Sequence, residues 1–131
     1  MIRKFRAYFN KYKRMIYNIG VVNTNSILVD FNGDGDCEYM FLTNDISLMQ
    51  SIGLKDENGV DIYEGDIVEY RDGEESFKGE VIINCFGAYV KTKNDYIRFE
   101  DFSDETTRLA GNCYVVGNIY EDQELLEEVK E

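Results

Sequence analysis

Oxygen-bearing side chains alternate along the segment DFNGDGDCEYMF, which covers residues 30–41. The four that fall at every second position are Asp30, Asn32, Asp34 and Asp36. This spacing, with Gly35 among them, matches the first half of a calcium-binding loop of the EF-hand type. Such a loop closes with a bidentate Glu at its twelfth position, and that position here is Phe41. We therefore interpret the segment as a solvated acidic turn, and calcium binding remains the alternative interpretation.

The segments on either side of this turn also bear on the calcium question. An EF-hand loop lies between two helices, whereas SILVDF (26–31) and CEYMFL (37–42) are rich in β-branched and aromatic residues. Asn-Gly and Asp-Gly pairs between two such segments are typical of tight hairpin turns. We expect two strands joined by an acidic turn.

Catalytic chemistry of other kinds finds little support in the residue types. The chain has no His, which removes the usual general base and zinc ligand. No Ser lies in a G-x-S-x-G motif. Cys37, Cys85 and Cys113 form no C-x-x-C pair and lie beside strand-forming residues, so we expect them to be small buried side chains. We predict no catalytic residues and no cofactor.

Charge is divided unevenly along the chain. The 14 basic and 26 acidic residues give a net charge of −12. Residues 1–29 contain six basic residues and no acidic one, whereas residues 30–131 carry a net charge of −18. The six basic residues are Arg3, Lys4, Arg6, Lys11, Lys13 and Arg14. We predict that they form an interaction surface, attracted to acidic surface either within the fold or on another copy of the chain.

The basic segment also permits a nucleic-acid interpretation. Tyr8, Tyr12 and Tyr17 lie among the cations and could stack on bases. The negative charge of the rest of the chain opposes the approach of nucleic acid. The same negative charge offers a different alternative, in which the protein mimics DNA and occupies a host DNA-binding protein.

The compartment is constrained by the cysteines and by hydropathy. An odd number of widely spaced cysteines is unlike a secreted disulfide framework and favours a reducing cytosol. No apolar run is long enough to cross a bilayer. We expect a cytoplasmic protein without membrane contact.

The N-terminal pattern leaves two local structures open. In residues 4–18, apolar residues recur at intervals of three and four, which predicts an amphipathic helix. The β-branched and aromatic content favours instead a hairpin with strands near 3–9 and 14–22. Further along, residues 45–53 predict a short helix, with Asp45 as its cap and Gly53 as its end.

Short strand-like segments follow at regular spacing. They are residues 66–71, 78–84, 88–92, 95–99 and 113–120, each separated by Gly, Asp or Asn. This spacing indicates a small barrel or a sandwich, and the order of the segments looks like a curled meander of the SH3-like kind. We predict one mainly β (α+β) domain over residues 1–131, with N-terminal strands in 1–55, an SH3-like β-barrel in 56–120 and a short C-terminal helix in 121–131.

Three segments carry a resemblance to a known family. IRKFRAYFNKYKRMIYN (2–18), LMQSIGLKDENGVDIYEGDIVEY (48–70) and VVGNIYEDQELLEE (115–128) resemble, in this order, the YopX family of phage and prophage proteins. The family's activity is undetermined, and the resemblance offers no catalytic residues to carry over. It implies a phage or prophage origin, a bacterial cytoplasm, homo-oligomers and, for the N-terminal segment, the hairpin.

The function that we expect follows from the missing chemistry and the uneven charge. It is that of a non-catalytic phage or prophage accessory protein that acts through protein–protein contacts and forms a homo-oligomer. Its partner would be a host or phage protein. The alternative is a nucleic-acid-binding or DNA-mimicking regulator of host functions.

Overall fold

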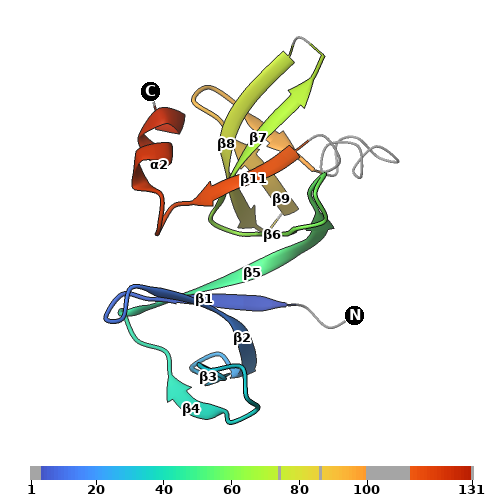
Figure 1. Cartoon of the computed structure of the whole chain (residues 1–131). Coiled ribbons are helices and arrows are strands. Elements are labelled where there is room, and N and C mark those ends of the chain that lie inside the picture. Colours follow the sequence, from blue (N-terminus) through green and yellow to red (C-terminus); the bar gives the residue numbers. More distant parts are fainter. Residues whose placement is uncertain (1–3, 74, 86, 100–112, 131) are drawn as a thin grey trace. The chain divides into compact units, whose positions relative to one another are not determined.

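The computed structural model describes residues 4–73, 75–85, 87–99 and 113–130, which form strands and one C-terminal helix (Figure 1). The chain divides into two compact units, Met1–Ser51 and Ile52–Glu131. The prediction of a mainly β fold with a short C-terminal helix is confirmed. The predicted sub-part boundary at residue 55 lies close to the division between the units, and a single domain stays a prediction. Arg3 lies outside the described residues.

The first unit is an antiparallel sheet that starts with a hairpin. Its strands are β1 (Phe5–Phe9), β2 (Arg14–Asn23), β3 (Ser26–Val29), β4 (Glu38–Phe41) and the first part of β5 (Ile46–Lys55). The pairing of Phe9 with Arg14 and of Ala7 with Ile16 shows that the hairpin interpretation of residues 4–18 is correct and the helix interpretation wrong. The sheet order is β4-β3-β2-β1-β5-β6, in which the last strand, β6 (Asp61–Tyr63), belongs to the second unit.

Strand β5 corrects the prediction of a short helix over residues 45–53. It pairs antiparallel with β1 from Ile46 opposite Phe9 to Gln50 opposite Phe5. Gly53, the expected helix end, lies within the strand with φ of 83°. The prediction failed because local cap signals are weak compared with a complete ladder to a neighbouring strand.

Alternation along the strands places the core of the first unit on one face of the sheet. Ile27 and Val29 are fully buried, while Leu28 between them is 39% exposed. The buried residues of this core are Ala7, Phe9, Ile16, Ile27 and Val29. Half-buried Phe31, Met40 and Ile46 pack against them. Burial of each large apolar side chain contributes about 1.5–3 kcal/mol to folding.

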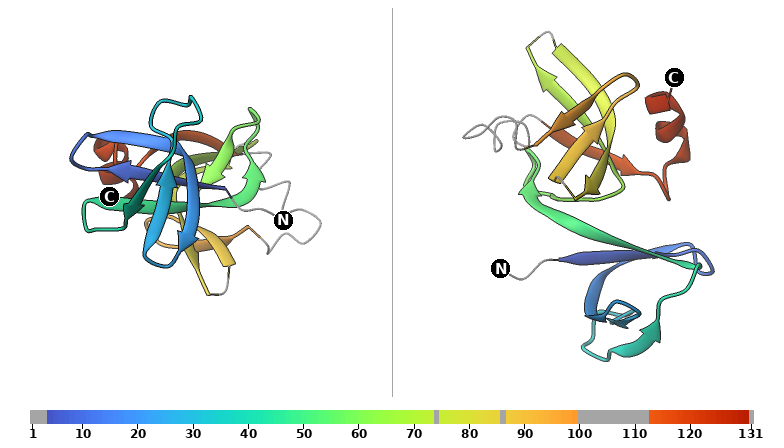
Figure 2. Two further views of the ribbon diagram at one scale, coloured as in Figure 1. Left: turned by 90° about the horizontal axis from the view of Figure 1, so that it is seen from below. Right: turned by 180° about the vertical axis from the view of Figure 1, so that it is seen from behind.

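The second unit contains a curled antiparallel sheet and the helix (Figures 1 and 2). Its elements after β5 are β6 (Asp61–Tyr63), β7 (Asp66–Asp72), β8 (Glu75–Asn84), β9 (Gly87–Lys91), β10 (Tyr96–Arg98), β11 (Cys113–Asn118) and α2 (Gln123–Lys130). The sheet order is β10-β9-β8-β7-β11, and α2 contacts β8 and β11. No closed barrel is detected in the described part of this unit, so the SH3-like barrel stays a prediction.

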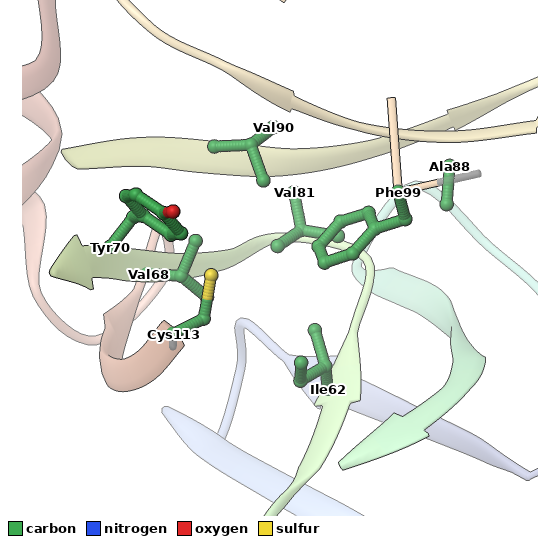
Figure 3. Close-up of a cluster of buried hydrophobic side chains, with 8 residues drawn as sticks. All are labelled: Ile62, Val68, Tyr70, Val81, Ala88, Val90, Phe99 and Cys113. Atoms are coloured by element: carbon green, nitrogen blue, oxygen red, sulfur yellow. The ribbon is translucent and has the colours of Figure 1, made fainter. Parts of the chain in front are cut away.

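Among the described residues, eight buried side chains form the core of the second unit (Figure 3). They are Ile62, Val68, Tyr70, Val81, Ala88, Val90, Phe99 and Cys113. Seven of them lie in β6, β7, β8, β9 and β11, and Phe99 directly follows β10. The Tyr70 ring stacks on half-buried Phe77 with the ring centroids 4.8 Å apart. Among the described residues, no helix has the length and apolar character needed to cross a membrane.

Candidate interaction surface

The predicted basic surface is only partly brought together by the fold. Lys11 and Lys13 lie in the turn between β1 and β2, and exposed Arg14 opens β2. Lys4 is exposed ahead of β1. Arg6, by contrast, is 2% exposed, and its guanidinium lies 5.9 Å from the centre of the Tyr17 ring. Arg6 is therefore not part of an exposed surface, because β1 lies between β2 and β5 and its residues from Arg6 to Phe9 are buried on both faces of the strand.

Hydrogen bonds to Asp45 and to Phe31 hold the basic turn in place. The carboxylate of Asp45 accepts the backbone N–H of Lys11 at 3.2 Å, and its carbonyl accepts that of Asn10 at 3.0 Å. The Arg14 guanidinium donates to the carbonyl of Phe31 at 3.1 Å. Phe31 directly follows Asp30, so the basic turn and the acidic turn adjoin within one copy of the chain.

The acidic turn is closed by hydrogen bonds from its own backbone N–H groups to the side chain of Asp30. Asp30 accepts N–H bonds from Gly33 at 2.8 Å and Asp34 at 3.2 Å on one oxygen, and from Gly35 at 2.9 Å on the other. Asp34 in turn accepts the N–H of Asp36 at 3.0 Å. These bonds, that of Gly35 foremost, hold the pKa of Asp30 below its ordinary value.

This geometry explains the alternating oxygens without an ion. Both oxygens of Asp30 are acceptors for the turn, while Asn32 and Asp36 are exposed. Among the described residues, no group of three or more His, Cys, Asp or Glu side chains is arranged to hold a metal ion. Calcium binding at this turn stays a prediction.

An apolar surface that the sequence did not identify lies on β3 and β4. Leu28 stands opposite Tyr39 in the register, and Phe41 is the next residue on the same face of β4. Leu28, Tyr39 and Phe41, which we call the outer face, are 39%, 53% and 66% exposed. The Tyr39 and Phe41 rings meet edge to face at 5.4 Å. The sequence signal that could have identified this surface is the run Tyr-Met-Phe-Leu at residues 39–42, because four consecutive apolar residues place apolar side chains on both faces of a strand.

In the segment around residues 56–66, which is part of the family resemblance, two carboxylates accept hydrogen bonds from the backbone. Asp56 is 6% exposed and accepts the N–H groups of Asn58 at 2.8 Å and Val60 at 2.9 Å. Its second oxygen accepts the N–H of Val115 at 2.9 Å, which ties the turn to β11. Asp66 is 1% exposed and accepts the N–H of Tyr63 at 2.8 Å.

The segment around residues 117–122 forms a similar network at the start of α2. The side-chain oxygen of Asn118 accepts the N–H groups of Tyr120 at 3.0 Å and Glu121 at 2.9 Å. The Asn118 N–H donates to the Asp122 carboxylate at 3.0 Å. Groups that satisfy buried backbone in this way stabilise the fold, and this accounts for their residue types without any substrate.

The cysteines differ from the expectation that all three are buried. Cys113 is buried, and this burial, together with the nearby Asp56 carboxylate, raises the pKa of its thiol to about 12. Cys37 and Cys85 are exposed, so the prediction is wrong for them. They lie just outside β4 and β8, where strand alternation no longer imposes a buried side.

A second surface feature combines cations with aromatic rings on β9 and β10. Lys91 pairs with Tyr96, and its ammonium lies 5.8 Å from the centre of that ring. Arg98 pairs with Tyr89, with 5.7 Å between the guanidinium and that ring centre. Tyr96 is 61% exposed. Cations and rings therefore alternate on one face of this hairpin.

The chain therefore consists of a β-sheet unit with a basic and an acidic turn, followed by an acidic β unit with a C-terminal helix. The three segments that resemble the YopX family lie in these two units. The family model of the YopX protein matches residues 4–127, and the chain belongs to this family. It is also similar to the protein EF1440 from Enterococcus faecalis in its crystal structure. That likeness has a TM-score of 0.66 and 26% identity, and covers 96% of this chain and 99% of the other. No curated protein matches the chain in sequence.

Proposed function

We propose that this YopX-family protein is a non-catalytic phage or prophage accessory protein, which acts in the bacterial cytoplasm through protein–protein contacts and associates with copies of itself. The observation that carries the proposal is the outer face, where Leu28, Tyr39 and Phe41 stay exposed. Burying apolar surface releases roughly 25 cal/mol per Å², so adjacent exposed rings favour a protein partner.

The charge distribution supports self-association through the first unit. Residues 1–51 contain six basic and five acidic residues, a net charge of +1. The remaining eight basic and 21 acidic residues give residues 52–131 a net charge of −13. Two copies of the first unit can therefore meet without strong repulsion, whereas two copies of the second cannot.

Sedimentation velocity over a range of protein concentrations, at low and at high salt, tests the proposal. We expect a species larger than the monomer that grows with concentration. If the outer face drives association, high salt strengthens it by screening the net negative charge. If the basic turn meets acidic surface on another copy, high salt weakens it. A monomer under every condition would remove self-association from the proposal.

The second candidate function is nucleic-acid binding, and the alternation of cations and rings on β9 and β10 favours it. Lys91 and Arg98 could bind phosphates while Tyr96 stacks on a base. A mobility-shift assay with single-stranded DNA and RNA at low salt separates this function from the first. Binding that is lost in Tyr96→Ala would support it, and no shift by the wild type would remove it. Capture of a host DNA-binding protein, displaced by free DNA, would indicate mimicry instead.

A further inference from the structure

Strand β4 is at the edge of its sheet, and its backbone is set for one more strand. Its register with β3 pairs Leu28 with Tyr39 and Ser26 with Phe41. The N–H of Leu42 donates to the carbonyl of Asn25 at 2.7 Å, which continues this ladder. Hydrogen-bonded pairs alternate along an antiparallel ladder. Residues 38, 40 and 42 therefore bond to β3, while the N–H and C=O groups of Tyr39 and Phe41 point to the open edge.

The side chains of this strand do not protect its edge from pairing. Natural edge strands are commonly guarded by Lys, by Pro, or by charged side chains that point inward. β4 contains neither Lys nor Pro, and its charged residue, Glu38, lies at its first position. Tyr39 and Phe41 instead add exposed rings beside the open backbone groups.

We propose that a second copy of this chain adds its own β4 antiparallel to this edge, about a two-fold axis through Met40 of each copy. In this register Tyr39 stands opposite the partner's Phe41, and Phe41 stands opposite the partner's Tyr39. Both pairs are hydrogen-bonded, because the backbone groups of these residues point outward. The inference rests on the self-association in the proposed function and names the surface and the register that produce it.

The register follows from the sequence of the strand itself. A two-fold axis through Tyr39 would place Phe41 opposite the partner's Cys37, and an axis through Phe41 would place Tyr39 opposite the partner's Thr43. The axis through Met40 is the one that pairs both rings with rings, and aromatic cross-strand pairs stabilise a sheet. It also places Glu38 opposite the partner's Leu42, so no like charges face each other across the new ladder.

A second copy fits this edge better than a strand of unrelated sequence. The pairing is self-complementary, as an isologous two-fold interface requires. The unit that carries β4 has a net charge of +1, so its copies approach without the repulsion that the −13 of the second unit produces. A four-residue strand covers less surface than the ~1,600 Å² of a standard interface, so we expect a dimer with a dissociation constant in the micromolar range or weaker.

Sedimentation velocity of Phe41→Lys, compared with the wild type, tests the surface. Two symmetry-related ring pairs are lost at once, so we expect the dissociation constant to rise by about tenfold or more. Phe41→Tyr should keep the dimer. Tyr96→Lys is the matched control, because Tyr96 is also exposed on a strand and lies in the second unit. Circular dichroism before and after heating shows whether each variant folds.

Disulfide trapping tests the register. Met40 and the partner's Met40 form a pair without hydrogen bonds, in which the Cα atoms lie about 4.5 Å apart, within the range for a disulfide. Met40→Cys, in a background of Cys37→Ser and Cys85→Ser, should therefore form a cross-linked dimer on mild oxidation. Glu38→Cys in the same background should not, because its Cα atoms would be about 13 Å apart.

The outcomes separate this inference from the broader one. If the wild type associates but Phe41→Lys associates equally well, or if Glu38→Cys cross-links as readily as Met40→Cys, the β4 pairing is wrong and self-association through another surface stands. If the wild type stays monomeric throughout, both proposals fail. Loss of the dimer in Phe41→Lys together with trapping at position 40 alone supports both.

Discussion

Asp56 joins two parts of the chain that are far apart in sequence by satisfying backbone donors. Its carboxylate accepts the N–H groups of Asn58, Val60 and Val115 in a site that is 6% exposed. A buried donor that loses its acceptor keeps the full cost of desolvation. Three backbone N–H donors converge on this carboxylate, so the position requires a side chain that accepts several hydrogen bonds. An apolar side chain cannot accept them.

Asp56→Ala should lower the free energy of unfolding by about 2–4 kcal/mol, because it leaves these donors without an acceptor. Urea unfolding followed by circular dichroism measures the change. The matched control is Asp61→Ala in the same segment, which removes an exposed ion pair with Lys55 at 3.2 Å. An exposed pair contributes about 0–1 kcal/mol. Equal losses in the two variants would contradict the role that we assign to Asp56.

Asp30 should make the stability of the first unit depend on pH. Its pKa is lowered in the folded state by the N–H bonds of the turn, so its contribution is complete above the unfolded value of about 3.9. That contribution is lost as the pH falls through the folded pKa. Asp30→Asn should therefore be less stable than the wild type at pH 7, and the difference should shrink below about pH 4.

Urea midpoints at several pH values measure this difference. Glu38→Gln is the control, because Glu38 is an exposed carboxylate of the same unit for which the described part of the structure gives no hydrogen bond. A gap between Asp30→Asn and the wild type that is constant over the whole pH range would show that the carboxylate charge is not what the turn requires.

Individual residues were predictable where a short motif fixes the backbone. Asn-Gly and Asp-Gly pairs predicted the turn at residues 30–36, where both Gly33 and Gly35 have positive φ. The burial of Arg6 was not predictable, because it depends on the strands that flank β1 on both sides. The exposure of Cys37 was not predictable, because it depends on where β4 begins.

At the scale of the elements, β5 shows how pairing overrides local signals. Residues 45–53 have a plausible helix cap and end, yet they form a strand because β1 offers a complete ladder. Asp45, the expected cap, instead bonds the β1–β2 turn. Most other strands were predicted within a few residues, because runs of β-branched and aromatic residues bounded by Gly, Asp or Asn mark them clearly.

The packing of α2 on β11 depends on the absence of a side chain at Gly117. A Cβ atom there would lie 2.6 Å from the Asp122 carboxylate and 2.7 Å from Leu125. Gly117→Ala should therefore force the side chains of Asp122 and Leu125 to shift, which loosens the contact of α2 with β11 and lowers the free energy of unfolding by about 1–3 kcal/mol. Hydrogen exchange should accelerate in residues 123–130. Gly20→Ala is the control, since its nearest neighbour would be 3.9 Å away, and there we expect little change.

At the scale of the whole molecule, charge distinguishes the two units. The net charges of +1 and −13 imply that self-repulsion destabilises the second unit and hardly affects the first. This division was visible in the sequence as a basic start and an acidic remainder. The boundary between the units was less visible, because it falls inside the continuous strand β5 with no linker composition to mark it.

Raising the salt concentration should stabilise the second unit selectively. Between about 20 mM and about 0.5 M NaCl the Debye length falls from roughly 20 Å to roughly 4 Å, which screens repulsion among its carboxylates. Hydrogen exchange read by mass spectrometry should slow in residues 52–131 and change little in residues 4–51. An equal response in both units would mean that net charge does not set their stabilities.

The place of Cys113 gives the second unit a built-in chemical reporter. Its sulfur lies among the apolar side chains of that core, and the raised pKa of about 12 leaves almost no thiolate at neutral pH. Cys37 and Cys85 face solvent, so an alkylating reagent marks them at once. A third mass increment would then arise only when the second unit transiently opens. The delay between the second and third increments therefore measures the rate at which the second unit opens, and the measurement needs neither a dye nor an engineered residue.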